Sequence, residues 1–124
     1  MQPEDRARIH HILDAAEAVL RWIEHKSGKE FANDDLLIAA TSYEIQIIGE
    51  AARNLSEEFT NGNPQLPWHK IIGMRHRIVH DYYVVDAQIL WTVATTHIPP
   101  LVDELRKAVP RRGAKDKKVN RKKR

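Results

Sequence analysis

Apolar residues recur at helical spacing along most of this chain, and this periodicity restricts its fold more than any other feature. Residues three and four apart lie on one face of an α-helix, so each such segment predicts an amphipathic helix. The only β-like run is "YYVV" at 82–85, which is too short and isolated to form a sheet. The sequence therefore predicts an all-α fold. In the first segment the apolar stripe consists of Ile9, Ile12, Leu13, Ala16, Leu20 and Ile23.

Breaks in the periodicity divide the chain into four or five helices. Gly28 is expected to end the first helix, and Asn33 or Asp34 to cap the second. Asp86 can cap the fourth, while Pro99 and Pro100 must kink or break it. Short connections between such helices favour an up-and-down antiparallel bundle. The helices are expected at 4–25, from 33 or 34 to 59, at 67–82, from 86 to the prolines, and at 99–108.

The charge of the chain is unevenly distributed. The chain carries +3 in total, but residues 111–124 hold nine lysines and arginines against one aspartate, a net +8, which leaves −5 for the rest. A basic run with almost no apolar content cannot offset its ordering entropy by burial. We therefore expect one helical domain at 1–110 and a disordered basic tail at 111–124. The tail would either solubilise the protein or attract nucleic-acid phosphates loosely.

Several classes of protein are disfavoured by composition. The chain has no cysteine, so disulfides, thiol nucleophiles and cysteine metal sites are excluded. No apolar run approaches the ~20 residues that a membrane span needs. The charged start "MQPEDRARIHH" does not resemble a secretory signal. These features predict a soluble cytoplasmic protein.

The segment "MRHRIVHDYY" at 74–83 concentrates polar chemistry on the third predicted helix. At 100° per residue, an arginine, Arg75, falls in the middle of the helix's apolar stripe. An unpaired buried guanidinium is costly, so this position is unexpected. The apolar stripe, predicted to face the core, contains Trp68, Ile71, Ile72, Ile78, Val79 and Tyr82. A neighbouring stripe contains His69, Gly73, His76 and His80, and the remaining side holds Lys70, Arg77 and Asp81.

Each of these residues also has a structural interpretation. Arg75 could form an internal ion pair with Glu44 or Glu50. His80 could be a partly exposed histidine at a helix end, and Tyr82 a core aromatic whose hydroxyl reaches water. A metal site is disfavoured, because Arg77 stands where an H-E-x-x-H motif has glutamate. We predict neither a metal nor another cofactor.

The catalytic interpretation is acid–base cleavage of RNA. RNA supplies its own nucleophile, the 2′-OH, so an enzyme needs a base such as histidine and a cation that spreads over the phosphate oxygens. Arg75 and His80 provide these two groups. Five residues place them about 140° apart on an ideal helix. Two copies crossing at a two-fold axis could aim both groups at one cleft, so the spacing favours a dimeric site.

Arg75-His76-Arg-Ile-Val-His80 resembles the R-x4-6-H signature of HEPN domains. With Tyr82 it gives R-x4-H-x-Y, which is similar to the toxin subfamily called HepT. The segments "YEIQIIGEAARNLS" at 43–56 and "LPWHKIIGMRHRIVHDYYVVD" at 66–86 resemble that subfamily as well, and the likeness covers about residues 4–109. The tail lies outside it.

The resemblance implies an all-α homodimer with metal-independent endoribonuclease activity. It implies that Arg75 and His80 are the catalytic pair and that His76 supports the cleft. It also implies a partner, a minimal nucleotidyltransferase antitoxin that transfers AMP to the motif tyrosine, here Tyr82. Two alternatives stay open, because an acidic body disfavours strong RNA affinity. One is a non-catalytic helper subunit that binds nucleotide or substrate for a nucleotidyltransferase, and the other is a purely structural helical dimer.

Overall fold

A computed structural model describes residues 1–78 and 86–109, with side chains for all of them except 74–78. Every regular element in these ranges is helical, which confirms the predicted all-α class. The elements are α1 (Pro3–Ile23), α2 (Gly28–Ala32), α3 (Asp35–Arg53), α4 (Glu57–Gly62), α5 (Trp68–Ile78), α6 (Ala87–Thr92), the π-helical segment η1 (Val93–His97) and α7 (Ile98–Ala108). None of these helices is long and apolar enough to cross a membrane.

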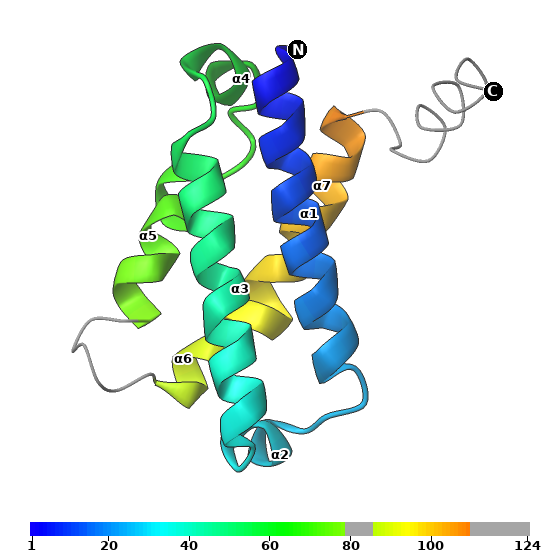
Figure 1. Ribbon diagram of the computed structural model, residues 1–124, viewed down its shortest axis with the longest axis vertical. Helices are drawn as coiled ribbons and strands as arrows, with labels where there is room; N and C mark the ends of the chain where they lie inside the picture. Colours follow the sequence, from blue (N-terminus) through cyan, green and yellow to red (C-terminus); the bar gives the residue numbers. More distant parts are fainter. Residues whose placement is uncertain (79–85, 110–124) are drawn as a thin grey trace, which may run out of the picture.

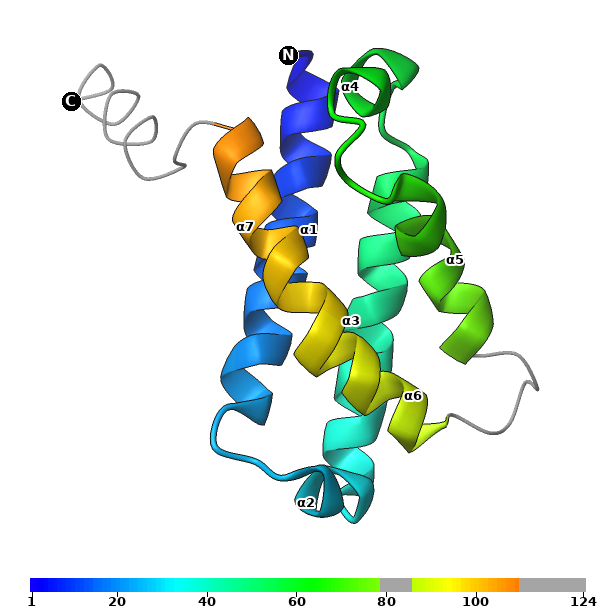
Figure 2. The ribbon, with the colours of Figure 1, turned by 180° about the vertical axis from the view of Figure 1, so that it is seen from behind.

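The two long helices, α1 and α3, form the centre of the fold. They run antiparallel side by side, and α5 packs beside α3 (Figure 1). The continuous path α6–η1–α7 crosses diagonally behind them, with α7 against α1 (Figures 1 and 2). The core lies between these layers. Its fully buried side chains include Ile9, Ile12, Val19, Ile45, Ile48, Leu90, Ile98 and Leu105.

The first predicted boundary at Gly28 is wrong. The helix α1 ends at Ile23, and His25 two residues later has a φ of 66°, the left-handed conformation that commonly follows a helix end. Gly28 instead begins α2, because Ser27 and Glu30 form a reciprocal capping box. The Glu30 N–H donates to Ser27 Oγ at 3.1 Å, and the Ser27 N–H donates to Glu30 Oε1 at 2.9 Å. The backbone bond from Ser27 lowers the pKa of Glu30.

The second predicted helix is in fact two. Asp34 caps α3 as expected, accepting from the Leu37 N–H at 3.0 Å. The helix then stops at Arg53 rather than near Phe59, and Ser56 caps the separate helix α4. The Ser56 hydroxyl accepts from the Phe59 N–H at 3.1 Å, which requires a non-helical backbone at Ser56.

A buried carboxylate fixes this break from the other end of the sequence. Asp5, in the first turn of α1, is only 2% exposed. Its Oδ1 accepts from the Ser56 N–H at 2.9 Å, and its Oδ2 accepts from the Ser56 hydroxyl at 2.5 Å. Because that hydroxyl also accepts from Phe59, Asp5 orients the cap of α4 and ties it to α1.

The last predicted helices join without interruption through a π-helical turn. Asp86 caps α6 as expected, accepting from the N–H groups of Gln88 at 2.9 Å and Ile89 at 3.1 Å. The predicted break at Pro99 and Pro100 becomes the start of α7 at Ile98. Prolines have no N–H, so two carbonyls one turn earlier lose their helical donors. The wider turn η1 lies at this point, with the Ile98 N–H donating to Val93 O.

Candidate active site

The first half of the motif lies on α5. Arg75 and His76 belong to this helix, although their side chains are outside the described set. His80 and Tyr82 fall in 79–85, outside the described residues, and so does the predicted region of the motif helix beyond Ile78. The described structure therefore shows what positions the motif helix and what lies beside it.

An aromatic anchor fixes the start of α5. The Trp68 indole N–H donates to the Asn63 carbonyl at 3.0 Å, and the ring packs edge-on against Phe59, with centroids 5.9 Å apart. The Trp68 backbone N–H donates to Leu66 O at 2.9 Å. These contacts attach the motif helix to α4, which is itself held by Asp5.

The apolar stripe predicted on α5 is narrower than the sequence suggested. Ile71 is 2% exposed and faces the core, but Ile72 is 36% exposed. The prediction that Ile72 faces the core is therefore wrong, because one residue turns a helix by about 100° and the contact with α3 covers a narrower arc. Position 75 follows Ile71 by four residues and Ile72 by three, so the backbone places it at the edge of the buried face. His69 and Lys70 are exposed.

The two flanks of α5 have different surroundings. Pro67, Lys70 and Ile71 border a cavity shared with η1 and α7. On an ideal helix, positions 72, 75 and 76 lie on the opposite flank. In Figure 1 the path α6–η1–α7 passes behind α1 and α3, so the side of α5 that borders the cavity turns toward the back of the molecule in that view.

The outer side of α3 carries an apolar face that the sequence analysis missed. Leu36 is 81% exposed and Tyr43 65% exposed, and seven residues place them on one side of the helix. Ala39, between them, is also exposed. The composition of the sequence could have revealed this face, because residues 36–49 include a single charged residue, Glu44. A helix that is apolar nearly all round normally has both sides covered.

Neither proposed ion pair of Arg75 can be traced in the described side chains. Glu44 is half-buried on α3. Glu50 is exposed, and it borders a shallow groove between α1 and α3 together with Arg8 and His11. The predicted ion pair of Arg75 with Glu44 or Glu50 stays a prediction, because the Arg75 side chain is outside the described set. Within residues 1–73 and 86–109, no three histidine, aspartate or glutamate side chains gather as metal ligands.

Comparison with known proteins decides the family. Residues 12–108 match the family described as Ribonuclease HepT-like. The chain belongs to this family. The HepT-like match covers the whole motif from Arg75 to Tyr82, and the basic tail lies outside it.

Curated relatives of the HepT-like chain span nearly the same length. A protein named "Putative RNase" from Caldanaerobacter subterraneus subsp. tengcongensis is 33% identical over 101 residues, which cover 82% of this chain and 90% of the relative. A protein of the same designation from Methanocaldococcus jannaschii is 28% identical over 100 residues, covering 81% and 92%. A protein named "Probable ribonuclease HepT" from Thermococcus cleftensis is 27% identical over 107 residues, covering 86% and 97%. No solved structure is significantly similar to the chain.

Proposed function

We propose that this HepT-like protein is a metal-independent endoribonuclease toxin whose catalytic pair is Arg75 and His80. The observation that carries the proposal is the family match over 12–108, because it includes the complete R-x4-H motif. The described part of α5 supports it further. The backbone places position 75 at the edge of the buried face, one turn after the buried Ile71.

The proposed reaction uses the nucleophile of RNA itself. His80 takes the proton of a 2′-OH, and the 2′-oxygen forms a bond to the adjacent phosphorus. The bond from phosphorus to the 5′-oxygen then breaks, leaving a 2′,3′-cyclic phosphate, and the departing oxygen takes up a proton from a protonated histidine or from water. The Arg75 guanidinium binds the phosphate oxygens as negative charge develops on them. RNA is thus the substrate, and no metal or other cofactor takes part.

An RNA-cleavage assay in the presence of EDTA tests this activity. Purified full-length protein is incubated with a labelled single-stranded RNA, and the products are separated by size and their ends identified. We expect fragments with cyclic-phosphate and 5′-hydroxyl ends, formed equally well with EDTA or with added Mg²⁺. Binding without cleavage would instead support the helper-subunit alternative, which the net charge of −5 on residues 1–110 keeps open.

We further propose that the active form is a homodimer that uses the apolar outer face of α3, defined by Leu36, Ala39 and Tyr43. Because α5 packs beside α3, a second copy seated on this face would bring its own motif helix near the first (Figure 1). Ile72, partly exposed on α5, would gain cover as well. Arg75 and His80 lie about 140° apart on one ideal helix, but in a cleft shared by two copies the arginine of one copy and the histidine of the other can face the same phosphate.

Introducing charge into this face should separate the dimer. We expect the wild-type protein to have about twice its 14.3 kDa chain mass in light scattering coupled to size exclusion. The double variant Leu36→Glu, Tyr43→Glu should dissociate at least about 100-fold more readily, since burying an unpaired carboxylate costs roughly 3 kcal/mol or more. Gln88→Glu adds charge at an exposed position of α6 and serves as the matched control. An unchanged mass for the double variant would exclude this face as the interface.

The partner we propose is a minimal nucleotidyltransferase antitoxin that transfers AMP from ATP to Tyr82. An adenylyl group would add bulk and negative charge close to Arg75 and so exclude RNA. Intact mass after co-expression with such a partner should show a gain of one or more AMP units, located on Tyr82 by peptide sequencing. The Tyr82→Phe variant should show none, while Tyr83→Phe should be modified normally. A gain that persists in Tyr82→Phe would contradict the assignment.

A further inference from the structure

A cavity of about 180 Å³ lies on the flank of α5 that faces away from the motif positions. Its floor is apolar and buried, with Leu66, Ile71, Val93 and Leu101 each 2–4% exposed. The space lies between the α4–α5 connection, the first turn of α5 and the η1–α7 path. A cavity of ~150 Å³ lined by apolar side chains accommodates a benzene ring, so this one has room for a single ring.

The walls of the cavity are formed by unusually restrained backbone. Pro67 and Pro100 both line it, one before α5 and one in the first turn of α7. Thr96 and His97 belong to the π-helical turn η1, which brings them to the cavity. Turns of this type are rare and frequently lie at functional sites. Because the prolines withdraw two N–H donors, backbone carbonyls of this turn lack their usual helical partners.

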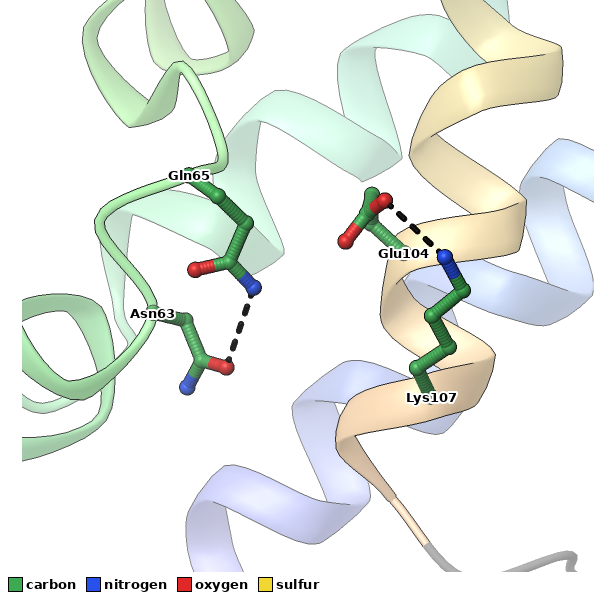
Figure 3. A network of polar contacts seen from close by, with 4 residues as sticks. All are labelled: Asn63, Gln65, Glu104 and Lys107. Carbon is green, nitrogen blue, oxygen red and sulfur yellow. Dashed lines mark hydrogen bonds and ion pairs between the residues drawn. The ribbon is translucent and has the colours of Figure 1, made fainter.

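The rim supplies polar groups and one charge of each sign, on Lys70 and Glu104. Gln65, from the α4–α5 connection, donates to Asn63 Oδ1, and Glu104, from α7, pairs with Lys107 (Figure 3). Glu104 Oε1 is paired with Lys107 Nζ at 3.4 Å, which offsets its charge. Lys70 is exposed and has no ion pair among the described side chains, and the His97 ring can donate a further hydrogen bond. An unmatched cation at the mouth of an apolar cavity favours a ligand with an apolar body and an anionic group.

We propose that this cavity binds a small organic anion built on a single ring, with the ring on the floor and the anionic group near Lys70. Such a ligand combines burial of apolar surface with charge pairing at the rim, the usual composition of a small-molecule site. Aryl carboxylates and aryl phosphates share this chemistry. The inference does not depend on the proposed ribonuclease activity, because it rests on the opposite flank of α5.

Ligand titrations monitored by nuclear magnetic resonance test the proposal on the full-length protein. The probes are benzoate, phenyl phosphate, benzyl alcohol as a neutral ring and acetate as an anion without a ring. We expect benzoate, phenyl phosphate or both to move the signals of Ile71, Val93 and Leu101, and the one that binds identifies the anionic group. Benzoate should bind about fivefold more tightly than benzyl alcohol, the ratio expected for about 1 kcal/mol of charge pairing. Acetate should leave these signals unchanged.

Two variants sharpen the experiment. Lys70→Gln should remove the preference for the anion while the neutral ring binds as before, and Lys29→Gln, which removes an exposed lysine of α2, should change neither. Thr96→Phe places a ring at the rim and should block all binding. The proposal is overturned if neither anion moves the floor signals at roughly 10 mM, a concentration above any useful affinity. It is also overturned if Lys70→Gln leaves the anion preference intact, or if those signals move only on addition of a partner polypeptide.

Discussion

Arg75→Ala is expected to lower the rate of RNA cleavage by about 10²- to 10³-fold, the range found when one donor to a developing oxyanion is removed. The loss should appear mainly in the rate of the chemical step, because the guanidinium is needed most as charge builds on the phosphate. Arg75→Lys should recover only part of the activity, since an ammonium keeps the charge but lacks the planar fork. The measurement is the single-turnover rate with a labelled RNA at saturating enzyme.

Arg77→Ala provides the matched control for this variant. It removes the same side chain two residues further along the motif segment, on the side predicted to be solvated. We expect its cleavage rate to stay near that of the wild type. Equal losses in the two variants would point to a general effect of positive charge on RNA binding, and would remove the specific role of Arg75. Circular dichroism and light scattering on both variants establish that fold and assembly are intact.

His80→Ala extends the same experiment to the proposed base. A positioned acid or base contributes typically about 10²- to 10⁴-fold, so a loss in that range is expected. The wild-type rate should depend on pH near neutrality, and the residual rate of the variant should lose that dependence. A variant with unchanged pH dependence would assign the proton transfer to another group.

Asp5→Ala is expected to have the largest effect on stability, lowering the free energy of unfolding by about 2–3 kcal/mol through the loss of hydrogen bonds to a charged group. The carboxylate accepts both the N–H and the hydroxyl of Ser56, and that hydroxyl caps α4. Asp5→Asn keeps one acceptor and should have a smaller effect. Urea unfolding monitored by circular dichroism measures the change.

Glu4→Ala is the control that distinguishes the loss of the Asp5–Ser56 hydrogen bonds from the loss of a negative charge at the start of α1. Glu4 and Asp5 both lie in the first turn of α1, where a negative charge interacts favourably with the helix dipole, but Glu4 is exposed. The difference between the two alanine variants therefore isolates the contact with Ser56. In a double-mutant cycle, Asp5→Ala and Ser56→Ala should be strongly non-additive. Additive effects would show that the two residues act independently.

The features of the fold that were predicted correctly depend on neighbouring residues. Asp34 and Asp86 cap helices through bonds to residues two or three positions ahead, and such short-range patterns are visible in a sequence. The break at Ser56 was missed because its cause lies 51 residues away, at Asp5. The capping box at Ser27 was present in the sequence, but Gly28 beside it was interpreted as a stop rather than a start.

In the candidate site too, features set by neighbouring residues were predicted and features set by distant contacts were not. The motif helix and its start at Pro67 or Trp68 were predicted from periodicity and from the proline, and the structure confirms the start and the helix as far as Ile78. The orientation of Ile72 was not predicted, because the width of a buried stripe depends on how closely α3 approaches. The exposed Tyr43 was missed because a surface that a partner would cover has the same composition as a core.

The long-range contacts of α1 have a consequence for the order in which the protein can fold during synthesis. This helix is made first, yet its first turn bonds to Ser56, and Glu17 pairs with Arg106 of α7. At roughly 5–20 residues per second, several seconds pass between translation of α1 and translation of α7. α3 can pack against α1 during that interval, but the side of α1 that contacts α7 has no final partner. For this chain, native closure of the domain must therefore wait until α7 has left the ribosome.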